Sequence, residues 1–188
     1  MWTRDGGGHW YQAQSPRPGG GFTVSCGNAQ NCVSAAHYFY FTTQDGAANW
    51  QTHLKRGRDL MKVSCPSAAT CYMIASSSDL ASNGTPAQEL FLSSGDGGRS
   101  WKETPITTAH GLLDGLSCPA APTCLISDDA GQVLLTKDGG TSWQDRSIDT
   151  PGGAGPTVID CPTPDLCYAG STSGRIWVGR FSGSPSPS

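Results

Sequence analysis

The sequence predicts an all-β fold, and three observations support this class. Gly, Pro, Ser and Thr are abundant and only 14% of the 188 residues are charged, a composition typical of turn-rich chains. No segment shows sustained helical periodicity of its apolar residues. Short apolar runs instead alternate with turn signals along the whole chain, as expected for the strands of antiparallel sheets.

Charge and hydropathy exclude two classes of partner. The net charge is -3 and the twelve Lys and Arg residues are scattered, so the chain lacks the basic stripe that nucleic-acid binding requires. No apolar run approaches the length of a membrane span. The opening residues MWTRDGG also lack the basic region and apolar core of a signal peptide. We therefore expect neither nucleic-acid binding nor membrane insertion.

The eight cysteines form four pairs, each with five residues between its members. An even number at one repeated spacing predicts disulfides formed in an oxidising compartment, and hence a secreted or extracytoplasmic protein. Metal binding is the alternative, but CxxC spacing is absent and the four His residues do not repeat with the cysteines. We expect no metal and no cofactor. The predicted disulfides are Cys26–Cys32, Cys65–Cys71, Cys118–Cys124 and Cys161–Cys167.

A second motif, with a Ser or Thr, an Asp, Gly and a Trp, recurs four times in step with the cysteine pairs. Its Trp residues are 40, 51 and 42 residues apart, and the first cysteines of the pairs are 39, 53 and 43 apart. Both series lengthen in the same interval, which predicts an insertion near 76–89. The motif residues are Thr3, Asp5, Gly7, Trp10, Thr43, Asp45, Trp50, Ser94, Asp96, Gly98, Trp101, Thr136, Asp138, Gly140 and Trp143.

Each repeat has the same predicted order of strands. One apolar strand leads into the first cysteine, as in LMKVSC, and a second leaves the other cysteine, as in CYMIA. A third apolar strand such as ELFLSS leads into the Asp motif, and a fourth carries the Trp. Four short strands joined by tight turns make one antiparallel blade, and a period of about 40 to 50 residues is typical of a β-propeller.

The spacing Ser/Thr-x-Asp-x-Gly-x-x-Trp resembles the Asp-box, or BNR repeat, of sialidases, sortilin-type receptors and photosystem II assembly-factor-like propellers. Three copies match it, and the copy at Thr43 departs from it because Ala47 replaces the second Gly. The Cys-Pro-x4-Cys pairs resemble those of extracellular Asp-box proteins of soil bacteria. The resemblance implies a turn between the third and fourth strands, on the outer rim of each blade. The Asp residues would then be structural, and the Trp residues would pack on the neighbouring sheet.

The two chain ends are predicted to share one blade of a propeller domain that covers residues 1–181, before a Ser/Pro-rich tail or linker at 182–188. GRIWVGRF (174–181) aligns with GQVLLTKD (131–138), so the last repeat supplies three strands and no Asp-box follows them. We expect a fourth strand around Trp10 to complete that sheet. A monomeric four-bladed ring, a head-to-tail dimer and a fragment of a longer propeller all fit this pattern.

Enzyme chemistry has little support in the sequence. A sialidase site needs three arginines, a Tyr paired with a Glu and an Asp acid, but this chain has only Glu89, assigned to the insertion, and Glu103, assigned to an outer strand. Asp114, Asp128 and Asp129 remain as candidates for paired-carboxylate hydrolysis, although each lies in or beside a turn signal. We therefore predict no catalytic residue.

The favoured interpretation is a non-catalytic extracellular module that binds an unknown protein or glycan through its loops. Part of a larger sialidase-like glycoside hydrolase, or of a receptor, is the alternative. The densest positive patch is the segment HLKRGRD, so the candidate binding residues are Lys55, Arg56 and Arg58. The aromatic segment YFYF at 38–41 is assigned to the core.

Overall fold

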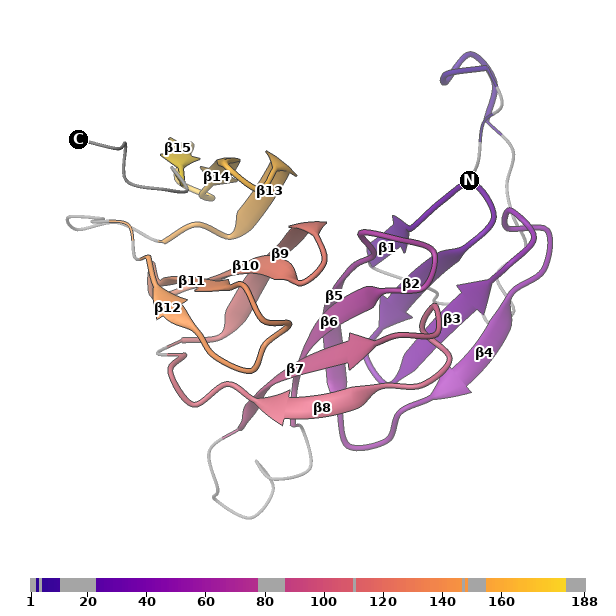
Figure 1. Cartoon of the computed structure of the whole chain (residues 1–188), viewed down its shortest axis with the longest axis horizontal. Helices are drawn as coiled ribbons and strands as arrows, with labels where there is room; N and C mark the ends of the chain where they lie inside the picture. Colours follow the sequence, from indigo (N-terminus) through magenta and orange to yellow (C-terminus); the bar gives the residue numbers. More distant parts are fainter. Residues whose placement is uncertain are drawn as a thin grey trace, which may run out of the picture.

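The structure is a computed structural model that describes residues 3, 5–10, 23–77, 87–109, 111–146, 148 and 155–181. All regular secondary structure in these ranges is β, arranged as four antiparallel sheets (Figure 1). None of the described segments forms a helix with the length and hydropathy needed to cross a membrane. The all-β class predicted from the sequence is confirmed.

The sheets follow one another along the chain. The first sheet contains β1 (Thr23–Cys26), β2 (Cys32–Ala36), β3 (Phe39–Thr43) and β4 (Gln51–Leu54). The second contains β5 (Asp59–Ser64), β6 (Cys71–Ser76), β7 (Glu89–Ser94) and β8 (Lys102–Pro105). The third contains β9 (Leu113–Ala120), β10 (Thr123–Asp128), β11 (Val133–Thr136) and β12 (Gln144–Asp145). The last sheet contains β13 (Val158–Thr163), β14 (Leu166–Gly170) and β15 (Ile176–Arg180).

The first turn of every sheet is closed by a disulfide, as predicted. The four bonds are Cys26–Cys32, Cys65–Cys71, Cys118–Cys124 and Cys161–Cys167. In three sheets the turn that holds the Asp motif joins the third and fourth strands and reaches back to the cysteine turn. The backbone N–H groups of Gly46, Gly97 and Gly139 donate to the carbonyls of Gln30, Ala69 and Pro122.

Up-and-down strand order places these two kinds of turn at the same end of each sheet, because successive strands reverse direction. We call this the stapled end. The opposite end carries the β2–β3, β6–β7 and β10–β11 connections and the segments that lead from one sheet to the next, and we call it the loop end. The arrangement separates covalently fixed turns from connections of variable length.

Consecutive sheets pack face to face, and the core lies between them. Val33 and Tyr40 of the first sheet pack with Val63 and Met73 of the second. Equivalent apolar clusters join the second sheet to the third and the third to the last. Burial of these alternate side chains is the main stabilising contribution, since each strand turns one face toward its neighbour.

A hydrogen bond is repeated at each of these interfaces. The Ser that precedes the first cysteine of one sheet accepts from the backbone N–H of the first cysteine of the next sheet. The three bonds are Ser25–Cys65 at 2.9 Å, Ser64–Cys118 at 3.1 Å and Ser117–Cys161 at 2.9 Å.

The sequence and the structure differ in the placement of the motif Trp residues. β4, β8 and β12 begin directly after the motif Trp, so the Trp belongs to the turn instead of the strand. The last sheet has three strands in the described part of the chain, and the strand expected around Trp10 continues into 11–22, which lie outside the described residues. Most of the predicted insertion, at 78–86, and the tail at 182–188 also lie outside them.

Candidate functional site

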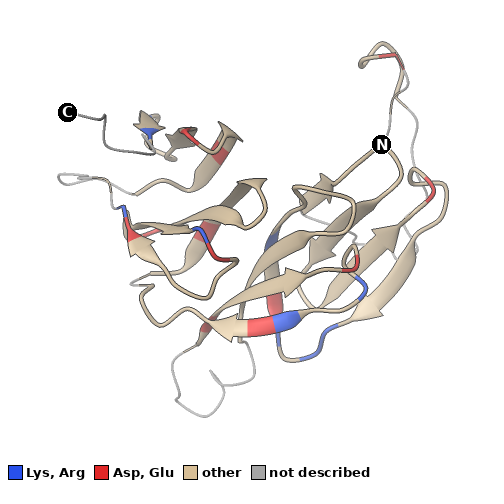
Figure 2. Ribbon diagram, in the orientation of Figure 1, with Lys and Arg blue, Asp and Glu red and all other residues tan. Residues whose placement is uncertain are grey.

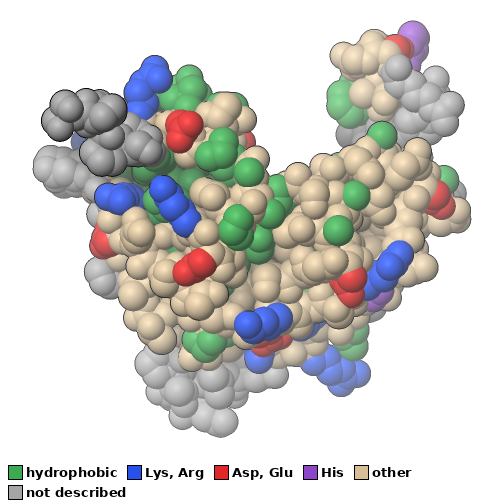
Figure 3. Space-filling view, in the orientation of Figure 1, with side chains coloured by type: hydrophobic (Ala, Val, Ile, Leu, Met, Phe, Trp, Pro, Cys, Tyr) green, Lys and Arg blue, Asp and Glu red, His purple; other side chains and the backbone are tan. Residues whose placement is uncertain are grey.

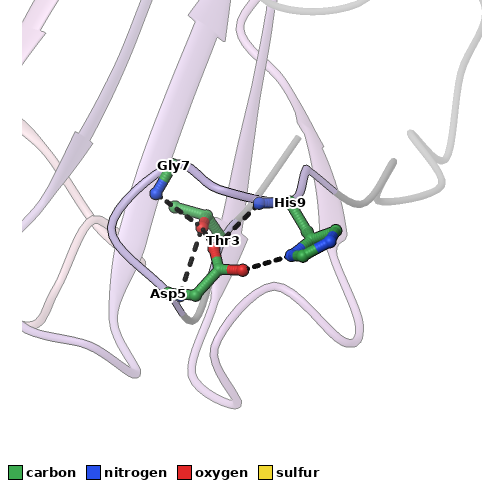
Figure 4. Close-up of polar contacts among 4 residues, drawn as sticks. All are labelled: Thr3, Asp5, Gly7 and His9. Atoms are coloured by element: carbon green, nitrogen blue, oxygen red, sulfur yellow. Dashed lines mark hydrogen bonds and ion pairs between the residues drawn. The ribbon is translucent and has the colours of Figure 1, made fainter.

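The Asp motif of the first repeat is a turn held by its own side chains. Thr3 Oγ1 donates to Asp5 Oδ1 at 2.7 Å and accepts from the Gly7 N–H at 3.0 Å (Figure 4). Asp5 Oδ1 also accepts from the backbone N–H of His9 at 2.9 Å, and its second oxygen contacts the His9 ring. The carboxylate is therefore occupied by contacts within its own turn.

The other three copies repeat this arrangement. In each, the hydroxyl donates to the Asp, and the Asp accepts from the backbone and side chain four residues further on. The donors are Thr43 and Asn49 to Asp45, Ser94 and Ser100 to Asp96, and Thr136 and Ser142 to Asp138.

These contacts lower the pKa of all four carboxyls to about 2, from an ordinary value of 3.8. In Asp5 and Asp45 the largest cause is the backbone N–H four residues on, and in Asp96 and Asp138 it is the serine hydroxyl at that position. The groups are anions at neutral pH. They are poorly suited to act as general acids, which need a pKa near the working pH.

Trp50 is half-buried, and the other three motif Trp residues have two different environments. Trp101 lies edge-on to Tyr40 of the preceding sheet, with 6.0 Å between ring centroids, and Trp143 lies edge-on to Phe91 at 5.1 Å. Both pack on a core cluster, as predicted. Trp10 does not, because 61% of it is exposed. The expectation that every motif Trp packs on a neighbouring sheet is therefore wrong for Trp10 among the described residues.

The candidate basic loop follows β4 and is largely engaged within the fold. Lys55 Nζ lies 2.8 Å from Glu103 Oε1, and Arg58 Nε donates to Glu103 Oε2 at 3.0 Å. Burial disfavours the Glu103 anion, but these two cations outweigh it and lower the Glu103 pKa. Figure 2 shows the blue loop beside β8, which carries neighbouring red and blue segments. Arg56 is exposed, so it is the member of the predicted trio that faces solvent.

Glu89 is not in a loop, as the sequence suggested, but is the first residue of β7. It is 8% exposed, and its Oε2 atom has no hydrogen-bond partner. Burial raises the pKa of Glu89, and the charges of Asp129 and Asp59 raise it further, against hydrogen bonds from Ser76 and Leu113. The signal in the sequence was its position at the start of the apolar run ELFLSS, where the next side chains are core.

Two of the remaining candidate carboxylates, Asp128 and Asp129, hold loops together, whereas Asp114 lies within β9. Asp128 is buried and accepts from the N–H groups of Gln132 at 2.7 Å and Gly111 at 2.9 Å. Asp129 Oδ1 accepts from the Leu112 N–H at 2.9 Å. These bonds tie the β10–β11 turn to the segment that enters β9. Within the described ranges, no group of three or more His, Cys, Asp or Glu is placed to bind a metal ion.

The loop end also carries exposed apolar side chains that the sequence did not single out. Tyr38, assigned to the core, lies in the β2–β3 turn and is exposed, whereas Tyr40 and Phe41 are buried as expected. Leu54 is the last residue of β4 and is exposed. It lies close to Tyr38, because the N–H of the next residue, Lys55, donates to the Tyr38 carbonyl at 2.7 Å. Leu112, which precedes β9, is 58% exposed. Tyr38 is exposed because it lies in a turn, and Leu54 and Leu112 are exposed at the end of one strand and just before another.

Comparison with known proteins gives a fold and no family. No protein-family model matches the chain, and no curated protein sequence matches it. YCF48 from Cyanidioschyzon merolae is 13% identical, over 93% of this chain and 71% of that one, with a TM-score of 0.59. YCF48 bound to D1 peptide is 14% identical, over 89% and 67%, also at 0.59. A GH74 enzyme of Niastella koreensis is 13% identical, over 80% of this chain and 26% of that one, at 0.53.

At these identities the likeness concerns the fold alone. Its agreement with four consecutive, face-packed antiparallel sheets confirms the fold class that the sequence predicted: the chain forms four blades of a β-propeller.

Proposed function

We propose that the chain is a non-catalytic protein-binding module of an oxidising, extracytoplasmic compartment, and that its partner binds at the loop end. The observation that carries this proposal is that three exposed apolar side chains lie at this end: Tyr38 in the β2–β3 turn, Leu54 at the end of β4 and Leu112 just before β9. Exposed apolar groups rimmed by polar residues are typical of protein interaction sites, and binding residues are common on loops held by a rigid scaffold.

Charged side chains beside this surface favour a protein ligand of mixed polarity. Arg56 and Asp129 are exposed at the same end. Lys55 and Arg58 are assigned a positioning role, because both pair with Glu103 and hold the loop on which Arg56 lies. Protein interfaces combine such apolar centres with a polar rim.

Two further findings agree with this proposal. YCF48 has a structure with a bound peptide, so a propeller of this fold class does present a surface to a protein segment. Four disulfides are compatible with an extracellular location, where thiols are readily oxidised. We assign the four motif Asp residues a structural role, since their oxygens are engaged in their own turns.

Selection from a phage-displayed random peptide library against the oxidised chain tests the proposal. We expect enriched peptides whose affinity falls by about tenfold or more when Leu54→Ser and Leu112→Ser are combined, equivalent to about 1.4 kcal/mol. Lys137→Ser, an exposed change at the stapled end, is the matched control and should bind as the unaltered chain does.

Three results would contradict the proposal. If the combined Leu54→Ser and Leu112→Ser variant bound peptides as well as the unaltered chain, the loop end would not be the binding surface. Binding confined to a glycan array would replace the protein partner with a carbohydrate. Hydrolysis of aryl glycosides that is lost in Glu89→Gln would instead support the glycoside hydrolase alternative, with the buried Glu89 as its acid.

A further inference from the structure

A cavity of about 130 Å³ lies between the third and last sheets. Val133 of β11 lines it from the third sheet, and Ala169 of β14 and Trp177 of β15 line it from the last sheet. Val133 and Ala169 belong to the apolar cluster that joins these two sheets, and Trp177 packs against that cluster. The cavity is therefore a gap in the packing between the two sheets.

At the two preceding interfaces the equivalent place is filled by a motif Trp. Trp101 packs on Tyr40 between the first and second sheets, and Trp143 packs on Phe91 between the second and third. Val133 has in β11 the position of these two aromatic residues, three places before the Ser or Thr of the motif. Because Val133 lines the cavity, the cavity includes the place that corresponds to the indole in the other two interfaces.

Two features of the sequence leave this space open. Val133 is smaller than the Tyr or Phe that has its position in the first two sheets. In addition, GRF at 179–181 stands where β11 leads into TKD at 136–138, so the motif residues do not recur there. A Cβ added at Gly179, which lines the cavity, would meet no atom closer than 3.4 Å. There is thus room for further atoms on both sides of the gap.

Two arginines give the cavity a positive rim. Arg146 and Arg180 are among its lining residues, and both are exposed. Long basic side chains lay their alkyl stems along apolar surface and keep the charged head in water, so we place both guanidinium groups at the mouth. The Arg146 N–H donates to the Val133 carbonyl at 2.6 Å, which holds the backbone of Arg146 beside β11.

The charge of these arginines is not neutralised by the fold. The Arg146 guanidinium donates to the neutral side-chain oxygen of Gln144 at 2.9 Å, and within the described ranges neither arginine forms an ion pair with a carboxylate. None of the described lining residues is acidic. Figure 3 shows hydrophobic side chains bordered by Lys and Arg on the part of the surface formed by the third and last sheets.

We propose that this cavity is a binding site for a small aromatic carboxylate. The ring packs on Val133 and Trp177, in the place that corresponds to the motif indole, and the carboxylate lies at the mouth beside Arg146 and Arg180. An apolar cavity of about 150 Å³ holds one benzene ring, so this cavity suits a ligand with a single ring. A guanidinium presents paired N–H donors that match a carboxylate, so charge as well as shape selects the ligand.

The site is free of the chain's own motif Trp and separate from the loop-end surface. Trp10 is 61% exposed, and Figure 1 shows the N-terminal motif beyond the first sheet, at the opposite end of the arc from β15. None of Tyr38, Leu54 and Leu112 lines the cavity. Binding here is therefore independent of the proposed protein partner, and each proposal can fail without the other.

NMR of the oxidised, ¹⁵N-labelled chain during titration with 3-phenylpropanoate tests the site. The reporter is the indole N–H signal of Trp177, identified by its loss in Trp177→Phe. We expect this signal to shift with a dissociation constant of about 1 mM or lower, within what a ligand of this size can reach. 3-Phenylpropan-1-ol has the same ring and chain without the charge, and we expect it to bind about threefold more weakly.

Four variants separate the role of the space from that of the charge. Val133→Phe and Gly179→Val fill the cavity from opposite sides, and each should weaken 3-phenylpropanoate binding by about tenfold or more with circular dichroism unchanged. When Arg146→Gln and Arg180→Gln are combined, the acid and the alcohol should bind equally. Arg175→Gln, an exposed base of the same sheet that does not line the cavity, is the matched control and should bind as the unaltered chain does.

Four results would overturn the proposal. The first is a Trp177 signal that does not move at about 10 mM 3-phenylpropanoate. The second is unchanged affinity in both Val133→Phe and Gly179→Val, which would place the ligand elsewhere. The third is equal binding of the acid and the alcohol by the unaltered chain, which would remove the carboxylate from the ligand class. The fourth is tighter binding by Trp10→Ser, which would show that the chain's own Trp10 occupies the cavity in solution.

Discussion

Ser117 Oγ accepts a hydrogen bond from the backbone N–H of Cys161, and 2.9 Å separate the two atoms across the interface between the third and last sheets. Both residues are buried. The bond thus satisfies a backbone donor that has no ladder partner of its own sheet at that point. Because the same bond recurs at the two preceding interfaces, it fixes the alignment of consecutive sheets along their strands.

Replacement of Ser117 by Ala should lower the free energy of unfolding by about 1–3 kcal/mol, because the Cys161 N–H would be left buried without an acceptor. Urea unfolding followed by tryptophan fluorescence measures the change. Ser173→Ala, at an exposed position, serves as the control and should be nearly neutral. If Ser117→Ala and Ser173→Ala were equally stable, a water molecule would be accepting the Cys161 N–H in place of the Ser117 hydroxyl.

Substitution by Ala at Gly139 and at Gly140 separates two effects, backbone strain and a steric clash. Both have positive φ, +87° and +70°, so Ala at either position should cost about 1–2 kcal/mol in backbone strain. A Cβ at Gly140 would also lie 2.3 Å from Phe91 Cδ1, whereas the nearest atom to one at Gly139 is 3.7 Å away. Gly140→Ala should therefore be less stable than Gly139→Ala by about a further 1–3 kcal/mol, measured by urea unfolding. Equal losses would show that the Phe91 ring can move aside.

Ala47 occupies, in the second motif, the position that Gly140 occupies in the fourth, and it has a φ of 70°. We expect Ala47→Gly to stabilise the chain by about 1 kcal/mol, since glycine adopts this conformation without strain. The measurement is the midpoint of thermal unfolding. Ala48→Gly, next in the chain and exposed, should not stabilise and controls for the entropy that glycine adds to the unfolded state.

Acid should weaken the Asp turns in a defined direction. The pKa of Asp138 is lowered to about 2 in the folded chain, from 3.8, by hydrogen bonds that favour its anion. A lowered pKa means that its contribution to stability is present above the unfolded value and is lost as pH falls from about 4 to about 2. Unfolding free energies across that range should fall less steeply in Asp138→Asn than in the unaltered chain. The control variant Lys137→Ser should show the same dependence of unfolding free energy on pH as the unaltered chain. If Asp138→Asn shows it too, Asp138 does not contribute to the loss of stability in acid.

Local chemistry was predictable from the sequence, and contacts between sheets were less so. Cysteine spacing predicted the disulfides, and the order of Thr136, Asp138 and Gly140 predicted a tight turn, because these features involve residues a few positions apart. The pairing of Arg58 with Glu103 spans 45 residues and depends on how two sheets meet. The exposure of Trp10 depends likewise on which sheet lies opposite, which no local pattern encodes, whereas the apolar run ELFLSS did carry a local signal for the burial of Glu89.

The disulfide in the first turn of each sheet fixes the strand register of that repeat independently of the other repeats. A strand that slips by one residue would move its apolar side chains to the wrong face, and a covalent link between the first two strands opposes that slip within each repeat separately. Lengthening a connection at the loop end, as between β6 and β7, therefore leaves the pairing of the other sheets untouched. Such a scaffold tolerates changes in its loops one repeat at a time.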